Sequence, residues 1–586
     1  MDFPLCSFGS SKLRTAKIFA VRDDFSPRQN PQKSSVPSVS SALCFWLRPY
    51  SFCCALILLF AQPFFAAATP KKEARPGLPA RIQAILSQPQ FASAEWGIHV
   101  IDAEHGDVIY SLNSSRLFVP ASNGKLLTTT AAFALVGPEH RFRTTVETSG
   151  TLDDQGRLTG DLIIVGRGDP NLSGRTLPYQ TKTERLSPAA WILEELAGQL
   201  VQKGVKSVRG DVIGDDSFYS AQRFPDGWAQ DDLQWGDGAP VSALSFNDNV
   251  LVLRIQPGEH AGDKAQIEFD PPLAYYDVDN RVTTSAEGVP RKIGVHRDPG
   301  SLKVYVWGSL PVNGQPAIEA IAIEDPAEYT AHLFRMLLEK RGITVTGAAY
   351  ARHADVAQFF DQPPAQPAAG APASLPVLAE HISLPLGEDL KVINKTSQNL
   401  HAELALRLVA RTTEAGGSVE GSVAALKAWL LRAGLHEEDF YVQDGSGLSR
   451  RDLITPAGMV QLLAYASRQP WAAAFEETLP VAAVDGSLAE RFLKSPAAGL
   501  VRAKTGTLGH VNALSGYGQT LSGKKFIFSI FCNNHNQPSS KIVGAIDSIV
   551  TLLVDDGRAA KTRSLTTEQR KAVSRESTRI NANQNQ

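Results

Sequence analysis

Hydrophobic and polar positions follow different patterns in different parts of the chain. Residues 95–112 carry two strand-like runs around a His-Gly-Asp sequence at 105–107, which predicts a hairpin. An apolar run with helical character begins at Ser122. Over residues 146–350, many short strand-like runs alternate with Gly/Asp turns, and this pattern predicts a β-rich segment.

Two helical stretches interrupt the β-rich segment and are similar to one another. Each consists of a helix, a glycine and a short strand: "SPAAWILEELAGQLVQKGVKSVRGDV" and "PAEYTAHLFRMLLEKRGITVTGAAY". Ser187 and Pro188 fit the cap and first position of the first helix, so we expect the helix to start there. The similarity indicates a duplicated helix–strand unit.

The remaining pattern divides the chain into parts. Residues 358–376 are rich in Pro and Ala and are predicted to be a linker or exposed loop. Helices and strands return beyond it, so we expect an α+β unit in two parts, residues 75–144 and 377–556. The β-rich insert, one or two domains, occupies 145–357. The tail, 557–586, lacks apolar periodicity and is predicted to be disordered.

Charge is unevenly distributed over these parts. The chain has 586 residues and a formal net charge of −2, but its first 68 residues and its tail are both basic. The body between them is therefore acidic. Nucleic-acid binding needs clustered Lys and Arg, so nucleic acid is not expected as a partner.

The N-terminus has the pattern of an export signal. Residues 1–68 are predicted to be a leader, in which "FCCALILLFAQPFFAAATP" supplies an apolar core and a small-residue cleavage site at 66–68. We therefore expect a periplasmic protein with no stable membrane span after cleavage; the alternative is an uncleaved signal that anchors the chain. Cys532 is the only cysteine beyond the leader, and its strand-like surroundings predict a buried structural thiol.

Ser122 and Lys125 open the predicted helix three residues apart. Positions i and i+3 share a helix face, so the hydroxyl and the amine can form a hydrogen bond. A helix N-terminus favours an attacking alkoxide and lowers the pKa of a nearby lysine, and a neutral lysine can take the serine proton. The alternative is an exposed lysine in the first helical turn. A second Ser-x-x-Lys, at 522–525, lies in a turn between two strand patterns.

Two further fragments carry candidate chemistry. Ser397 and Asn399 present a hydroxyl and an amide at the start of another helix; the alternative is an N-cap. Lys504, Thr505 and Gly506 lie on a predicted strand, where the glycine leaves room for a ligand to approach the backbone. The alternative for this fragment is a solvated edge strand.

Together and in this order, the three fragments resemble the motifs of the penicillin-binding proteins and serine β-lactamases. The long gap between Ser122 and Ser397 is similar to that of the class C low-molecular-mass penicillin-binding proteins, the D-alanyl-D-alanine carboxypeptidase/endopeptidase family. "LTGDLIIVGRGDPNLSG", "LKVINKTSQNLHAELALR" and "DGSGLSRRDLITPAGMVQLL" add to this likeness, which covers residues 78–556. It implies a penicillin-recognising serine transpeptidase-like domain, an antiparallel sheet with helices.

The resemblance also implies roles for the motif residues. Ser122 would attack the penultimate D-Ala carbonyl of a peptidoglycan stem peptide, with Lys125 as the general base. Ser397 would relay a proton to the leaving amine, and Lys504 would hold Ser397 and the substrate carboxylate electrostatically. Asn399 would bind a substrate amide.

Further positions are implied to bind substrate. Thr505 would bind the terminal carboxylate beside Gly506, and the backbone N–H of Thr507 would share the oxyanion hole with that of the nucleophile. In relatives, an acidic residue of the insert helps to grip the free amine of a diamino acid. Asp215, with Asp216 close behind, is the matching position, and an Asx-turn at a strand end is the alternative.

The remaining polar candidates are assigned structural roles. Asp169 and Asp444 are expected to support turns, His510 to lie in a loop, and Gly124 to be tolerated because it falls in a first helical turn. The sequence contains no metal-binding motif, so no metal or cofactor is expected.

Three function classes fit the sequence. The favoured one is a D,D-peptidase, a carboxypeptidase or an endopeptidase, with peptidoglycan peptides and β-lactams as ligands and a homodimer as an open alternative for its assembly. A β-lactamase-like hydrolase is the second, but the large insert argues against it. A non-catalytic wall-binding scaffold is the third, and the three intact motifs argue against it.

Overall fold

The computed structural model describes residues 76–180, 187–356, 375–413 and 415–555. The predicted leader and tail, and nearly all of the predicted linker, lie outside these ranges. The described residues from Leu78 to Asp555 belong to one compact unit. No helix within the described ranges has both the length and the apolar character needed to cross a membrane.

One sheet draws its strands from the first and last parts of the described sequence. Its order is β2-β1-β22-β21-β20, and every neighbouring pair is antiparallel. The predicted hairpin over residues 95–112 is confirmed as β1 and β2. The strands are β1 (Glu95–Asp102), β2 (Val108–Leu112), β20 (Val501–Leu508), β21 (Val511–Gln519) and β22 (Lys525–Asn533).

The inner strands of this sheet bury side chains on both faces, since successive side chains of a strand point to opposite faces and both faces are covered there. In β22, Phe528, Ile530 and Cys532 pack into one core, whereas Ile527 and Phe531 pack into another. Cys532 is a completely buried free thiol, as predicted.

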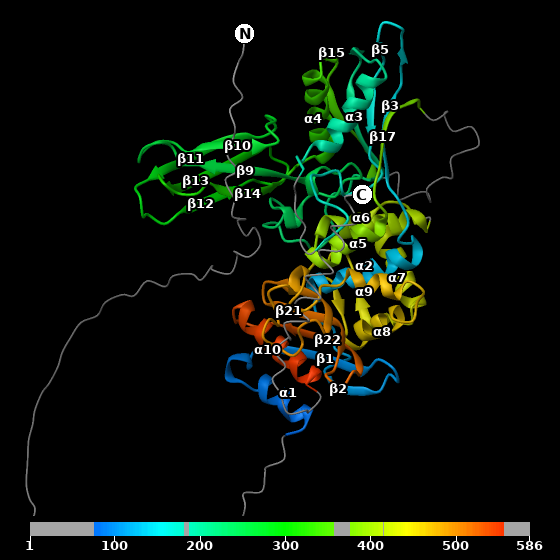
Figure 1. Cartoon of the computed structure of the whole chain (residues 1–586), viewed down its shortest axis with the longest axis vertical. Coiled ribbons are helices and arrows are strands. Elements are labelled where there is room, and N and C mark those ends of the chain that lie inside the picture. Colours follow the sequence, from blue (N-terminus) through cyan, green and yellow to red (C-terminus); the bar gives the residue numbers. More distant parts are fainter. Residues whose placement is uncertain (1–75, 181–186, 357–374, 414, 556–586) are drawn as a thin grey trace, which may run out of the picture. The chain divides into compact units, whose positions relative to one another are not determined.

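Helices cover the two faces of the sheet (Figure 1). α1 and α10 contribute to the first core, and α2 and α5 to α9 form the second. These helices are α1 (Leu78–Leu86), α2 (Lys125–Leu135), α5 (Leu386–Thr396), α6 (Asn399–Thr412), α7 (Val419–Arg432), α8 (Pro456–Ala466), α9 (Ala472–Thr478) and α10 (Ser539–Val554).

Between the two parts of this helix–sheet unit, the chain forms four further sheets. Their orders are β16-β8-β6-β3-β17, β15-β7-β5-β4, β11-β13-β12 and β10-β9-β14. The strands are β3 (Arg143–Thr148), β4 (Thr151–Leu152), β5 (Arg157–Thr159), β6 (Leu162–Val165), β7 (Ser207–Arg209), β8 (Val212–Ser220), β9 (Val250–Gln256), β10 (Gln266–Asp270), β11 (Asp277–Ser285), β12 (Lys292–His296), β13 (Lys303–Pro311), β14 (Ala317–Ala322), β15 (Thr344–Val345), β16 (Ala349–Ala354) and β17 (Val377–Ile382).

Strand β17 differs from the expectation for its segment. We predicted that the second part of the α+β unit begins at residue 377, but β17 pairs antiparallel with β3 in a sheet of the insert. The reason is that the chain enters the insert along β3 and leaves it along β17. These two strands run in opposite directions and pair with each other.

The two similar helix–strand units lie side by side. Helices α3 (Trp191–Gln202) and α4 (Pro326–Lys340) are in contact, and the strands after them pair in parallel, β7 with β15 and β8 with β16. The predicted start of α3 at Ser187 is wrong: the helix begins at Trp191, after a turn in which the Trp191 N–H donates to the Pro188 carbonyl.

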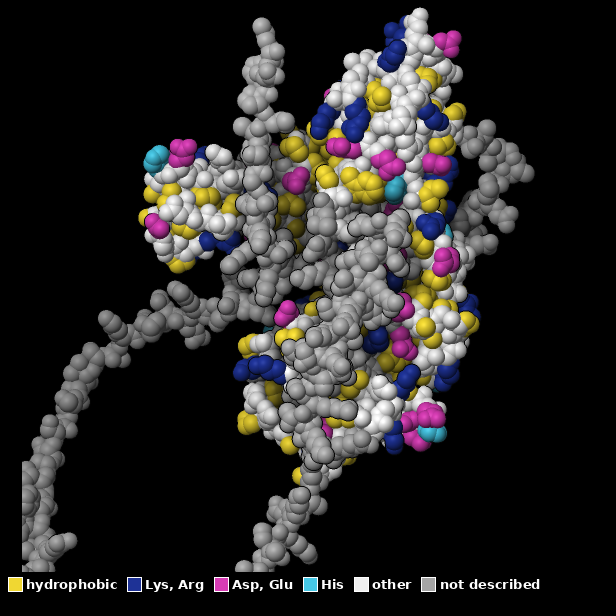
Figure 2. All heavy atoms as spheres, viewed as in Figure 1, with side chains coloured by type: hydrophobic (Ala, Val, Ile, Leu, Met, Phe, Trp, Pro, Cys, Tyr) yellow, Lys and Arg dark blue, Asp and Glu magenta, His cyan; other side chains and the backbone are white. Residues whose placement is uncertain are grey.

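Acidic and basic side chains are interspersed over the described part of the face in Figure 2. Such mixing keeps single-sign electric fields small.

Candidate active site

Ser122 and Lys125 lie at the start of α2, in hydrogen-bond contact. Ser122 belongs to a 3₁₀ turn, Ala121–Gly124, and the α-helix itself begins with Lys125. The Lys125 Nζ lies 3.0 Å from the Ser122 Oγ. Lys125 is completely buried, so the alternative of an exposed first-turn lysine is wrong.

Two further acceptors surround the Lys125 amine. Its Nζ donates to the Oδ1 of Asn399 at 2.6 Å and to the carbonyl of Ser446 at 2.6 Å. These two oxygens only accept hydrogen bonds, so a neutral amine gives both of its protons to them. Its lone pair then faces the hydroxyl of Ser122.

Burial is the main influence on the charge of Lys125. It lowers the pKa of the amine to about 8, although nearby carboxylates, chiefly Asp444 and Glu403, oppose the shift. A substantial fraction of Lys125 is therefore neutral near pH 8, which is the state that a general base requires.

Ser397 and Lys504 form the second serine–lysine pair. Ser397 follows α5 in the left-handed conformation, with φ 65°, and the Lys504 Nζ donates to its Oγ at 2.8 Å. Lys504 is completely buried, and burial together with the charge of Lys125 holds its pKa well below the usual range. Lys504 also donates to the carbonyl of Thr505 at 2.9 Å.

The N-cap alternative for Ser397 and Asn399 is wrong. Gln398 caps α6, because its side-chain oxygen accepts from the Leu400 N–H at 2.8 Å. Asn399 uses both ends of its amide elsewhere: Oδ1 accepts from Lys125, and Nδ2 donates to the carbonyl of Asp237 in the insert at 2.8 Å. Asn399 thus joins the first motif to the insert.

Strand β20 carries the third motif at an edge of the sheet. The predicted strand is confirmed, and it is an edge strand, but Lys504 on it is not solvated. The Thr505 hydroxyl donates to Ser487 Oγ at 2.8 Å, and the side chain of Thr507 is exposed. A Cβ on Gly506 would lie 2.6 Å from the Pro120 carbonyl oxygen, so this glycine lets β20 approach the Ser122 turn.

A turn at residues 444–449 contacts the amine of Lys125 through the carbonyl of Ser446. Asp444 accepts hydrogen bonds from the N–H groups of Gly447 at 2.6 Å and Ser449 at 2.7 Å, which confirms its predicted turn role. A Cβ on Gly124 would lie 3.1 Å from the Gly447 Cα, so glycine at this position allows the turn to pack closely.

Three buried carboxyl groups have an electrostatic role that the sequence pattern did not reveal. Glu403 and Asp452 join Asp444 around Lys125, and all three raise its pKa. Burial, together with the charge of Asp444, raises the pKa of Glu403 to about 8. The available signal was an acidic residue inside an apolar helix, "HAELALRL", but the sequence does not show that it faces Lys125.

Among the described residues, no contact joins Asp215 to the three motifs. Its Oδ1 accepts from the Ser217 N–H at 2.9 Å, an Asx-type contact, and Oδ2 lies 3.3 Å from Arg352. Asp216 pairs with His353 at 2.8 Å. The amine-binding role of Asp215 stays a prediction.

Asp169 and His510 take the expected local positions. The Asp169 Oδ1 accepts from the Asn171 N–H at 2.9 Å, so its turn role is confirmed, and burial raises its pKa to about 6. His510 is exposed in the turn between β20 and β21, with φ 66°.

The two serine–lysine pairs and the amide between them lie where an antiparallel sheet meets its helices. This arrangement defines the class: a serine acyl-transfer enzyme of the penicillin-recognising fold.

Comparison with known proteins gives the family. The chain belongs to the D-Ala-D-Ala carboxypeptidase 3 (S13) family, whose model matches residues 78–553. It is accordingly a class C penicillin-binding protein and a serine-type carboxypeptidase.

Individual relatives agree with the family match. The chain is 32% identical over 498 residues to the D-alanyl-D-alanine carboxypeptidase of Actinomadura sp. strain R39, covering 83% of this chain and 86% of that protein. It is 26% identical to the D-alanyl-D-alanine carboxypeptidase DacB of Haemophilus influenzae, with 77% and 88% covered. The crystal structure of penicillin-binding protein 4 from Haemophilus influenzae shares the fold, with a TM-score of 0.68, 24% identity, and 81% and 99% covered.

Proposed function

We propose that this carboxypeptidase removes the terminal D-alanine of peptidoglycan stem peptides through an acyl-enzyme on Ser122. The observation that carries the proposal is the contact of the Ser122 hydroxyl with a buried lysine whose other partners are acceptors only. The same chemistry, applied to a crosslink between two stems, gives the D,D-endopeptidase activity that the sequence leaves open.

In the first step, Lys125 takes the proton of Ser122 while the Oγ attacks the penultimate D-Ala carbonyl. The backbone N–H groups of Ser122 and Thr507 are proposed to bind the resulting oxyanion, where each donor contributes about 3 kcal/mol. When the amide bond breaks, the proton passes to the leaving amine by way of Ser397. Water then hydrolyses the ester and frees the serine hydroxyl.

Other motif residues are proposed to hold the substrate. Lys504 and the hydroxyl of Thr505 bind the terminal carboxylate, and Gly506 keeps the strand close to the nucleophile. Asn399 keeps one amide proton beyond its hydrogen bonds to Lys125 and the Asp237 carbonyl, and this proton is proposed to bind a carbonyl of the substrate backbone. The short Lys504–Ser397 contact of 2.8 Å supports a shared role in proton relay and carboxylate binding.

Penicillin is proposed to acylate the same serine, and export to the periplasm is proposed from the leader sequence. Penicillin-binding protein 4 of Haemophilus influenzae, which shares this fold with a TM-score of 0.63, has been solved in complex with a β-lactam. The leader pattern of residues 1–68 supports export.

The test is the intact-protein mass after incubation with benzylpenicillin, beside a Ser122→Ala control whose fold is checked by circular dichroism. We expect a persistent adduct of one drug molecule in the unvaried protein and none in the control. An adduct that forms and disappears within seconds would favour the β-lactamase-like alternative. No adduct in either protein would overturn the proposal.

A further inference from the structure

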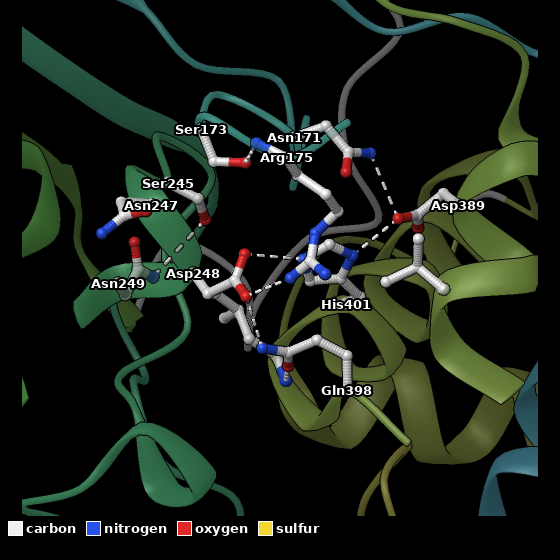
Figure 3. Close-up of polar contacts among 12 residues, drawn as sticks. Asn171, Ser173, Arg175, Ser245, Asn247, Asp248, Asn249, Asp389, Gln398 and His401 are labelled. Carbon is white, nitrogen blue, oxygen red and sulfur yellow. Dashed lines mark hydrogen bonds and ion pairs between the residues drawn. The ribbon is translucent and has the colours of Figure 1, made fainter. Parts of the chain in front are cut away.

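A largely buried cluster of charged and polar side chains joins the insert to the helix pair that carries Ser397 and Asn399 (Figure 3). We call it the His401 cluster. Its members are Arg175 and Asp248 from the insert, Asp389 on α5, Gln398 in the turn between α5 and α6, and His401 on α6.

His401 lies between two carboxylates and is completely buried. Its Nδ1 is 2.6 Å from Asp389, and its Nε2 is 3.1 Å from Asp248. A carboxylate only accepts hydrogen bonds, and a neutral imidazole donates only one, so both contacts require the imidazolium form. Burial disfavours that form, but the two carboxylates outweigh it and raise the pKa of His401.

On the insert side, Asp248 is the residue that contacts most other members of the cluster. It lies in a three-residue segment, Asn247–Asn249, in which every residue has a left-handed φ, between 50° and 58°. Besides His401, its carboxylate accepts from the guanidinium of Arg175 and, at 2.9 Å, from the side-chain amide of Gln398. Asn249 fixes the segment by donating to the Pro240 carbonyl at 2.7 Å.

On the other side, the cluster's contacts bracket the turn that presents Ser397. Asp389 lies in the first turn of α5, Gln398 directly follows Ser397, and His401 lies in the first turn of α6. A serine with φ 65° is strained and persists only where surrounding contacts impose it. The ion pairs of the cluster supply such contacts.

We propose that His401, clamped between Asp248 and Asp389, is a positioning residue of this carboxypeptidase. It fixes the turn so that Ser397 meets Lys504 and Asn399 meets Lys125. The inference rests on the proposed acyl-enzyme function, because it concerns the rate at which Ser122 is acylated.

The test uses two variants, His401→Gln and Asp248→Asn. Asp248→Asn is nearly isosteric, and asparagine tolerates a left-handed φ, so this variant keeps the backbone while removing the charge. We measure benzylpenicillin acylation by intact mass over time and over drug concentration, per folded molecule. We expect the acylation rate constant to fall at least tenfold in each variant, with the dissociation constant of the non-covalent complex changed less than threefold.

The chain offers a matched control in His353. This histidine is also clamped between two carboxylates, with Nδ1 2.8 Å from Asp216 and Nε2 3.0 Å from Asp325, but it does not contact the three motifs. We expect His353→Gln to lower the melting temperature and to leave the acylation rate constant of the folded protein within twofold. Equal losses of acylation in His353→Gln and His401→Gln would overturn the inference.

The double variant His401→Gln/Asp248→Asn tests whether the two side chains act on acylation as one pair. Removing His401 alone leaves Asp248 and Asp389 repelling each other, and Asp248→Asn relieves that repulsion. The double variant is therefore expected to acylate faster than the product of the two single effects predicts. Independent, multiplicative losses would overturn the inference, as would full acylation rates in both single variants.

A failure of the proposed function is distinguishable from a failure of this inference. If the unvaried protein forms no adduct, the acyl-enzyme itself is absent. If the unvaried protein is acylated and the His401 and Asp248 variants match its rate, only the positioning role fails.

Discussion

At the scale of single residues, the surroundings of Lys125 support its proposed role as the general base. The amine is completely buried at the start of α2, and burial lowers its pKa to about 8 against the pull of Asp444 and Glu403. Its contacts with Asn399 and Ser446 leave one direction free, toward Ser122. The residue types alone supply a serine and an amine, but burial and these contacts favour the neutral amine that the proposed general base requires.

This state predicts the pH dependence of acylation. Below pH 8 the amine of Lys125 is mostly protonated, so the acylation rate constant should rise about tenfold per pH unit and level off above about pH 8. Benzylpenicillin acylation from pH 6 to 9.5 measures it. In Lys125→Arg the acylation rate constant should fall at least a thousandfold, because a guanidinium does not give up its proton.

Glu403 is the control for assigning this pH dependence to Lys125, since the pKa of Glu403 is also raised to about 8. Glu403→Gln removes that titration and leaves the amine of Lys125 in place. An inflection that survives in Glu403→Gln does not come from Glu403, which leaves the two buried amines of Lys125 and Lys504. Its disappearance in that variant, or a flat profile in the unvaried protein, would contradict the assignment.

At the scale of elements, the site depends on how closely strand β20 approaches the Ser122 turn. Gly506 makes this approach possible, because any Cβ at that position would meet the backbone carbonyl of Pro120 at 2.6 Å. Since β20 also carries Lys504, its distance from the turn sets how the third motif faces the first.

We therefore expect Gly506→Ala to push β20 and the turn apart. The free energy of unfolding should fall by about 2–3 kcal/mol, as in other overpacked interiors, and acylation should slow at least tenfold. Gly544→Ala is the matched control, because this glycine lies inside α10 and an added Cβ would meet nothing within 4 Å beyond the adjacent backbone of its own helix. The Gly544→Ala substitution should raise the free energy of unfolding by up to about 1 kcal/mol. Calorimetry and acylation rates measure both, and equal behaviour of the two variants would contradict the packing argument.

At the scale of the whole molecule, the sheet that carries the third motif forms only when the first and last described segments of the chain meet. β1 and β22 lie near opposite ends of the described sequence and pair with each other. α10 packs on the same core as these two strands. Ile542, Ile546 and Val550 of α10 are almost completely buried in that core. The C-terminal helix is thus part of the support for Ser122, although it lies far from it in sequence.

Truncation tests this dependence. A chain ending at Gln537 loses α10 and exposes the apolar face of the sheet, so we expect it to aggregate or to bind no fluorescent penicillin. A chain ending at Asp555 keeps every described element and should match the full-length protein in melting temperature and acylation. Penicillin binding by the shorter chain, or its loss in the longer one, would contradict the proposed dependence.

The sequence by itself determined what depends on near neighbours. Strand alternation and turn residues located the β1–β2 hairpin, and the spacing of Ser122 and Lys125 placed a hydroxyl and an amine on one turn. Local patterns also located the Ser397 fragment at a helix start and the Lys504 fragment on a strand. These features are set by contacts within a few residues, so periodicity and spacing are enough to find them.

Only the tertiary structure decided what depends on distant partners. The pairing of β17 with β3, the carboxylates around Lys125 and the clamp on His401 join residues far apart in sequence. A strained φ at Ser397 and a lowered pKa at Lys125 are both unfavourable in an isolated segment. The folded protein maintains them because burial and long-range contacts fix the turn and remove water from the amine, and no local pattern records either effect.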